Sequence, residues 1–329
     1  MPQISHAYAV GRVRSLEKNL LSKQTLERML SAPNAQEAAR TLSEAGWGDA
    51  QNVQEVDVLA QNHMRNACAL VRECTPETDI TDCFLLKFDI LNLKTLVKAR
   101  LMGQKEPVLS PNGTLNEDKL RHAVAEGKYS DLPEEYQETM AKIEQRVAVE
   151  ADPLYIDAQL DKLLYRLIAT RLSRAKHVPE EIRAYFSAKA DSVNLLIALR
   201  AHEMGKSADF ARDLYVEGGE IPAGQLARVV EDPGKVLSVV ERMPYAPWVK
   251  RGMERYEHGE GLAPLEKQFD DYEIGLIRPG RYQVTSILPL IGYLLARERE
   301  TAAVRLIVTA KSVNASETAL KARLRELYA

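Results

Sequence analysis

The stretch LDKLLYRLIATRL, residues 160–172, decides the secondary structure expected for this chain. Its apolar residues recur at spacings of three, four, seven and eight, and lysine and arginine occupy the other side. The apolar positions are Leu160, Leu163, Leu164, Leu167, Ile168 and Leu172. This period of about 3.6 residues predicts a helix that buries one face.

The same helical period extends outward through most of the chain. It recurs in residues 16–30, 59–71, 88–101 and 290–309, whereas sustained alternation of apolar and polar residues, the mark of a strand, is absent. Glycine and proline interrupt the pattern at residues 107–113, 218–222, 232–234 and 259–264. The sequence therefore predicts an all-α protein.

Composition excludes several classes of protein. The chain has 329 residues, 45% of them apolar, and a net charge of −3, which is ordinary for a globular protein and gives no basic surplus for nucleic acid. Aromatic residues make up only 6%, which disfavours a β-rich fold. The odd set of Cys68, Cys74 and Cys83 contains no CxxC pair, so we expect a reducing, cytoplasmic location.

No segment is expected to cross a membrane. Residues 1–15 lack the apolar core of a signal peptide. The longest uncharged apolar stretch, residues 282–296, is too short to span a bilayer and contains Pro289. Any membrane association is therefore expected to come through a partner.

Two sequence patterns recur along the chain. The first places apolar residues at offsets of zero, five, eight and nine; its copies are Leu21, Leu26, Met29, Leu30; Leu115, Leu120, Ala123, Val124; and Ile221, Leu226, Val229, Val230. The second comes later in each copy: Asp89, Asn92 and Gly103 have the same spacing as Asp191, Asn194 and Gly205, and a weaker third copy contains Glu300 and Ala303. Two patterns in constant order predict three related helical units.

These units have boundaries at residues 1–112, 113–217 and 218–329, the last with a helical tail over residues 315–328. The recurring aspartate is interpreted as an N-cap, because its carboxylate accepts the free N–H groups of a first helical turn. The asparagine three residues on is expected to bridge to a neighbouring helix. A structural role is favoured over catalysis, which does not need three copies of one carboxylate.

The motif search predicts no catalytic, cofactor-binding or metal-binding residues. GxxxxGK[ST], GxSxG and a strand-linked GxGxxG are all missing, and the six histidines are scattered. Two carboxylate pairs, Asp157 with Asp161 and Asp270 with Asp271, lack an accompanying histidine and are expected to form solvated polar faces. The acidic run 131–161 and the basic run 297–329 are either such faces or patches for protein partners.

A family resemblance is carried by both ends and the middle of the chain. The run Val10-Gly11-Arg12-Val13-Arg14-Ser15-Leu16-Glu17 resembles the start of the C subunit of archaeal and bacterial A/V-type ATPases, the homologue of the eukaryotic V-ATPase d subunit. The segment Phe88-Asp89-Ile90-Leu91-Asn92-Leu93-Lys94 is similar to the family's Asp-x-x-Asn-Leu-Lys signature. The C-terminal run that includes Pro289, Tyr293, Leu294, Glu298, Glu300 and Arg305 resembles its closing helices, although Ala303 stands where the family often has asparagine.

The resemblance implies a fold, a role and a set of partners. It implies three similar helical units around a pseudo-threefold axis, arranged as a funnel. It also implies a non-catalytic connector in the central stalk of a rotary ATPase, one copy per complex and peripheral to the membrane. Its partners would be the axle subunits D and F and the proteolipid ring, in proton or sodium transport linked to ATP. Two alternatives stay open from the residues alone: a helical enzyme whose site the motif search misses, and a helical scaffold outside any motor.

Overall fold

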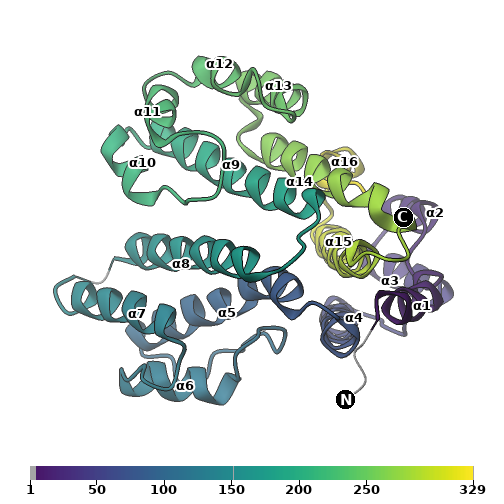
Figure 1. Cartoon of the computed structure of the whole chain (residues 1–329). Helices are drawn as coiled ribbons and strands as arrows, with labels where there is room; N and C mark the ends of the chain where they lie inside the picture. Colours follow the sequence, from purple (N-terminus) through teal and green to yellow (C-terminus); the bar gives the residue numbers. More distant parts are fainter. Residues whose placement is uncertain (1–4, 151, 329) are drawn as a thin grey trace. The chain divides into compact units, whose positions relative to one another are not determined.

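A computed structural model describes residues 5–150 and 152–328, which contain helices and no β-strand (Figure 1). The prediction of an all-α protein is confirmed. The α-helices of these residues are α1 (His6–Glu17), α2 (Lys23–Ser31), α3 (Ala35–Glu44), α4 (Val53–Cys74), α5 (Thr78–Leu101), α6 (Glu117–Glu126), α7 (Glu134–Val147), α8 (Pro153–Arg174), α9 (Glu180–Glu203), α10 (Ala208–Leu214), α11 (Ala223–Glu231), α12 (Val236–Val240), α13 (Ala246–Arg255), α14 (Ala263–Ile277), α15 (Leu288–Ser312) and α16 (Glu317–Arg323). Short helical turns of other types are η1 (Pro233–Lys235), η2 (Tyr256–Glu260) and η3 (Arg278–Tyr282).

Side-chain caps explain where many of these helices begin. Ser22 accepts a hydrogen bond from the Thr25 N–H at 3.1 Å and begins α2. Asp152 accepts one from the Leu154 N–H at 2.9 Å and begins α8, whose first residue is proline. A cap side chain satisfies N–H groups that the helix itself leaves without a partner, so these residues set helix boundaries locally.

Two of the predicted helices differ from the structure. Residues 16–30 do not form one helix, because α1 ends at Glu17 and α2 begins at Lys23. The predicted tail helix over residues 315–328 is helical only in α16, and residues 324–328 continue without helix. The other predicted segments, residues 59–71, 88–101, 160–172 and 290–309, lie inside α4, α5, α8 and α15.

The chain forms two compact bodies. Of the described residues, the terminal body contains 5–77, 179–185 and 243–328, which come from the first and last parts of the sequence. The central body contains residues 78–178 and 186–242. The two bodies are built from separated stretches of the chain, whereas the three sequence units are consecutive ranges. The unit boundaries at residues 112/113 and 217/218 therefore stay a prediction.

In the central body, α5 and α8 pack side by side in opposite directions (Figure 1). Lys94 of α5 pairs with Asp161 of α8 at 2.6 Å, and Lys98 pairs with Asp157 at 2.7 Å. Farther along the pair, Arg171 of α8 contacts Asp82 of α5 at 3.1 Å. The residue numbers rise on one helix as they fall on the other, which fixes the antiparallel register.

The terminal body has its core between α15 and the helices that begin the chain. Fully buried side chains include Met29 of α2, Leu42 of α3, and Val304 and Ile307 of α15. The apolar stripes of α2, α3 and α4 are thus covered by a helix from the other end of the sequence.

Candidate functional site

Asp89 lies in the interior of α5 and anchors the loop that leads to the next helix. Its carboxylate accepts hydrogen bonds from the Thr114 N–H at 2.9 Å, the Thr114 hydroxyl at 2.6 Å and the Leu115 N–H at 3.0 Å. The side chain is fully buried. Asp89 therefore does not begin a helix, and the N-cap interpretation is wrong: the N–H groups that it accepts belong to a loop distant in sequence.

Asp191 makes the same kind of contact from the interior of α9. Its two carboxylate oxygens accept the Glu220 N–H at 3.0 Å and the Ile221 N–H at 2.9 Å. It is also fully buried. Here too the N-cap interpretation is wrong, and the aspartate binds the residue that begins the next copy of the apolar pattern.

Glu300 of α15 also binds the backbone N–H of a residue that begins a copy of the apolar pattern. Its Oε1 accepts the N–H of Leu21, and its Oε2 accepts Arg297 Nη1 at 2.6 Å. Both side chains are about 95% buried or more. Burial alone would lower the pKa of Arg297, but the Glu300 charge and the Tyr293 hydroxyl raise that pKa above its ordinary value. Arg297 thus stays charged and neutralises the glutamate.

We call each of these contacts a joint: a buried carboxylate of a long helix that accepts the N–H of the residue beginning the apolar pattern. The joined pairs are Asp89 with Leu115, Asp191 with Ile221, and Glu300 with Leu21. In each case a short helix, α6, α11 or α2, begins two residues after the joined residue. The three apolar residues that follow in each copy of the pattern are all buried.

Asn92 and Asn194 reinforce the first two joints. Asn92 donates to the Ser110 carbonyl and accepts the Ser110 N–H, both at 2.8 Å. Asn194 makes the same pair of bonds with Val216, at 2.8 and 2.9 Å. Both amides are buried, and each holds a loop segment where a bridge to a neighbouring helix had been expected. Ser110 and Val216 each lie five residues before their joined residue.

The long helices end alike. Gly103 and Gly205 have φ of +68° and +63°, and the N–H of the next residue bonds to the carbonyl five residues back at 2.8 Å. Asn314 follows α15 with φ +56°, and Ala315 makes the corresponding bond at 2.9 Å. Asn314 follows Glu300 at the same sequence spacing at which Gly103 follows Asp89. Sequence reasoning missed Asn314, although asparagine is the side chain that best tolerates a left-handed helix end.

A further pair of contacts connects the ends of the long and short helices. Arg100 donates to the Val124 carbonyl at 2.6 Å, and His202 donates through Nδ1 to the Val230 carbonyl at 2.8 Å. Arg100 and His202 follow the carboxylates of their helices at one and the same sequence spacing. Val124 and Val230 are each the last apolar residue of their copy of the pattern. The two surroundings thus match in contacts as well as in sequence spacing.

The joint carboxylates hold loop backbone in place and are not free for catalysis or metal binding. The carboxylates are occupied by backbone N–H groups inside the core, and the residues that the structure describes contain no cluster of three metal-ligand side chains. A pocket of about 740 Å3 between α5, its following loop and α6 is lined by Arg100, Lys105 and Arg121 but not by a joint carboxylate. Burial raises the pKa of the Cys83 thiol to about 12, which leaves it protonated and unsuited to nucleophilic chemistry.

The two carboxylate pairs singled out in the sequence are engaged in the fold. Burial raises the pKa of Asp161, against the lowering effect of Lys94, and Asp157 pairs with Lys98. Asp271 is 8% exposed and pairs with Lys267 at 2.7 Å. The expectation of a solvated polar face is therefore wrong for Asp271.

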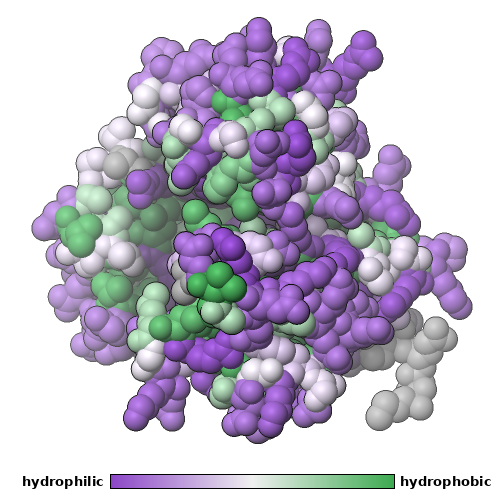
Figure 2. All heavy atoms as spheres, turned by 90° about the vertical axis from the view of Figure 1, so that its left-hand side faces the viewer, coloured by the Kyte–Doolittle hydropathy of each residue, from purple (hydrophilic) through white to green (hydrophobic). Residues whose placement is uncertain are grey.

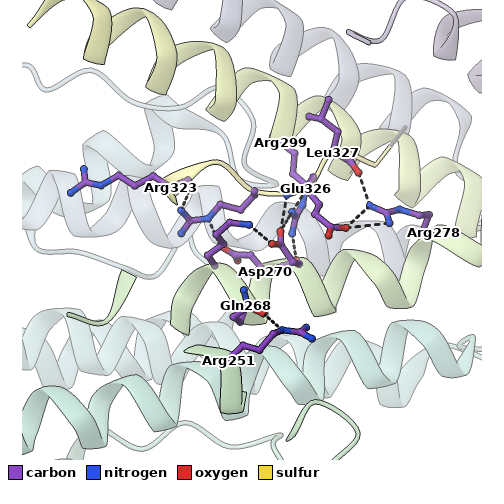
Figure 3. A network of polar contacts seen from close by, with 11 residues as sticks. Arg251, Gln268, Asp270, Arg278, Arg299, Arg323, Glu326 and Leu327 are labelled. Carbon is purple, nitrogen blue, oxygen red and sulfur yellow. Dashed lines mark hydrogen bonds and ion pairs between the residues drawn. The ribbon is translucent and has the colours of Figure 1, made fainter. Parts of the chain in front are cut away.

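Asp270 and Asp271 hold the C-terminal segment on α14 and α15 (Figure 3). Arg325 donates to Asp270 at 2.9 Å, and the Glu326 N–H donates to Asp271 at 2.7 Å. Arg299 of α15 donates to the Glu326 carbonyl at 2.9 Å. These contacts lie within the terminal body and hold residues 325 and 326, beyond the end of α16, in place.

Ion pairs inside the bodies account for much of the uneven charge. Within the acidic run 131–161, Glu144 pairs with Arg100, and both Asp157 and Asp161 pair with α5. Within the basic run 297–329, Arg305 pairs with Asp57 at 2.6 Å and Arg325 with Asp270. These charges serve internal packing, which weakens the interpretation of the two runs as patches for partners.

Comparison with known proteins finds relatives among the C subunits of A-type ATP synthases and V-type ATPases. The chain is 24% identical to the C subunit of the A-type ATP synthase of Pyrococcus furiosus, over 92% of this chain and 85% of the relative. It is also 24% identical to the C subunit of the V-type sodium ATPase of Enterococcus hirae, over 96% of this chain and 97% of the relative. The family model described as the ATP synthase (C/AC39) subunit matches residues 9–323. Because this match spans nearly all of the sequence, the chain belongs to the ATP synthase (C/AC39) subunit family.

Proposed function

We propose that this chain is the central-stalk connector of a rotary A/V-type ATPase. In this proposal it couples the axle subunits D and F of the catalytic head to the proteolipid ring during proton or sodium transport. One copy per complex lies at the cytoplasmic face of the membrane. Three similar helical units surround a pseudo-threefold axis as a funnel, with sequence boundaries at residues 1–112, 113–217 and 218–329.

The observation that carries the proposal is the family match over residues 9–323. The family is a structural subunit of ATP synthase and not a catalytic one, in agreement with the prediction from the motif search. The described residues contain no helix with the length and apolarity that a bilayer crossing needs. A connector reaches the membrane sector through other subunits and needs no such helix.

The joints supply the stiffness that a connector needs. Torque is transmitted only if the protein does not deform, and close-packed interiors have low compressibility. At each joint a buried carboxylate holds a backbone N–H through a hydrogen bond to a charged group, which is stronger than a neutral one. Each short helix is thereby fixed to the long helix that carries the carboxylate of its joint.

Exposed apolar side chains in the central body suit contact with other proteins. Met102 and Met204 directly follow the last residues of α5 and α9, stand one residue before the left-handed glycine, and are 69% and 53% exposed. Figure 2 views the side on which these two helices end in Figure 1, and hydrophobic residues are scattered there among hydrophilic ones. Flexible methionine side chains at a surface adapt readily to a binding partner.

Reconstitution of the motor with and without this chain tests the proposal. We expect ATP hydrolysis by the catalytic head to continue without the chain, while ion pumping by the membrane sector stops. Restoring the chain should restore pumping. Pumping that stays fully coupled to hydrolysis in the absence of the chain would contradict the proposal, as would ATP turnover by the isolated chain.

A further inference from the structure

Two connecting segments of the central body run between matching fixed points but differ in length. Each begins at a left-handed glycine, Gly103 or Gly205. Each then reaches a residue whose backbone an asparagine side chain holds, Ser110 or Val216. Ser110 comes seven residues after its glycine, whereas Val216 comes eleven residues after its own. The second segment therefore places more residues between equivalent points.

The longer segment forms α10, which packs on α11 and α8 (Figure 1). Ala211 of α10 is buried, and Phe210 and Leu214 are half-buried, so one face of this short helix lies on the body. The shorter segment has no helix between Gly103 and Ser110, and the pocket of about 740 Å3 lies there, between α5, the segment and α6. Because α6 and α11 carry the same apolar pattern, the pocket adjoins the counterpart of the helix on which α10 packs.

The pocket has an apolar floor and a charged wall. The buried apolar residues that line it are Leu96, Ala99, Leu109 and Val124. On α6, Glu117 and Arg121 line it one helical turn apart; both are half-buried, and neither forms an ion pair with any residue that the structure describes. The corresponding residues of α11 are Ala223 and Ala227. Charges that have already lost part of their water gain from a complementary partner, which alanine does not require.

We infer that this pocket is a docking site for one short amphipathic helix of a partner protein. The helix would lie against α6 as α10 lies against α11, with apolar side chains on the floor, a carboxylate facing Arg121 and a cation facing Glu117. Helices commonly bind other proteins in this way, with an apolar face in a groove. The inference goes beyond the proposed function, because the isolated chain presents the site whether or not it belongs to a motor.

A peptide with the sequence of residues 207–216 tests the shape of the site. A hydrocarbon staple between positions 209 and 213, which are both exposed in α10, keeps the peptide helical and leaves its buried face free. We expect up to about 1 mM peptide to shift the methyl resonances of Leu96, Leu109 and Val124 in the full chain, and to leave those of Ile143 on α7 unchanged. Absence of these shifts would overturn the inference.

A variant that fills the pocket locates the bound peptide. Ala125 is an exposed lining residue of α6, so Ala125→Trp should fold normally and bind the peptide at least about tenfold more weakly. The control Ala141→Trp changes an exposed residue of α7 outside the lining and should bind as the native chain does. Equal affinity of both variants would overturn the inference. Self-association of the peptide-free chain that Ala125→Trp abolishes would also overturn it, since a second copy would then be the occupant.

The charged wall is tested by making it resemble α11. The double variant Glu117→Ala/Arg121→Ala should bind the peptide at least about threefold more tightly than the native chain. Two further peptides, with Ala208→Lys/Ala211→Glu or Ala208→Glu/Ala211→Lys, cover both directions of the bound helix. One of them should bind the native chain at least about threefold more tightly than the double variant. If neither peptide shows this preference, the charges select no partner and the inferred chemistry of the helix is refuted.

Discussion

At the scale of single residues, the joints differ in the length of the carboxylate side chain. Where the carboxylate is Asp89 or Asp191, the loop backbone comes so close that a Cβ on Gly113 or Gly219 would overlap it. Both glycines lie two residues before the joined residue. In the third joint the corresponding residue is Asn19, and the carboxylate is Glu300, which is one methylene longer. Since the third joint has a longer carboxylate and asparagine in place of glycine, we expect no such close approach there.

This difference predicts opposite outcomes for one substitution at two equivalent positions. Gly113→Ala should lower the free energy of unfolding by about 1–3 kcal/mol, because the new methyl group displaces the Asp89 carboxylate or the loop. Asn19→Ala changes an exposed residue and should alter that free energy by less than about 0.5 kcal/mol. Urea denaturation of both variants measures the difference; equal effects would contradict this account of the glycine.

The asparagines of the first two joints give a second prediction. Asn92→Leu or Asn194→Leu should destabilise the fold by about 1–3 kcal/mol, because each leaves a buried N–H and a buried carbonyl without a partner. Denaturant unfolding measures this loss. Leu91→Ala, at a position 52% exposed, is the control and should have little effect. A leucine variant as stable as the native chain would show that these bonds contribute nothing net.

At the scale of helices, sequence periodicity predicts those with a continuous apolar stripe and misses boundaries set by distant partners. The stripe in residues 160–172 lies entirely within α8. The apolar residues from 16 to 30 also keep helical spacing, but the chain breaks its helix there, because the Leu21 N–H bonds to Glu300 and not to a residue one turn earlier. That partner is 279 residues away, so the apolar spacing alone does not reveal the break; the one local signal is Ser22, the N-cap of α2.

The role of the joint carboxylates was equally hidden from local reasoning. The spacing of Asp89 and Asn92 marked them as a recurring pair. The same two residue types can cap the start of a helix or hold a loop from the middle of one, so the spacing alone does not distinguish these roles. Only the fold shows that the N–H groups come from residues 114 and 115. The helix-end pair Gly103 and Gly205 was visible as spacing, whereas Asn314 was not, because it differs in residue type.

The C-terminal segment gives a prediction at the same scale. Asp271→Ala should lower the free energy of unfolding by about 3–5 kcal/mol, because it leaves Lys267 and Arg299 without their buried partner and frees the Glu326 N–H. Thermal unfolding followed by circular dichroism measures the loss. Glu317→Ala removes an exposed pair with Lys321 within α16 and should leave the melting temperature nearly unchanged. Equal melting temperatures for the two variants would refute the importance of this network.

At the scale of the whole molecule, the proposed function predicts which changes affect assembly without affecting the fold. The double variant Met102→Glu/Met204→Glu should fold normally, since both side chains are exposed, and should bind the rest of the motor at least about tenfold more weakly. Co-purification with the other subunits measures binding. The control Val58→Glu changes another exposed apolar residue, on α4, and should bind normally. Unchanged binding of the double variant would remove these methionines from the partner surface.

The core shared by the two ends of the chain also has a consequence during synthesis. Ribosomes make a protein from its N-terminus, and Glu300 emerges 279 residues after Leu21. At about 5–20 residues per second, this interval is roughly 15–55 s. Throughout it, the apolar faces of α2, α3 and α4 have no α15 to cover them. These early-made helices therefore gain their native packing late, and we expect their apolar faces to need a chaperone until α15 has emerged.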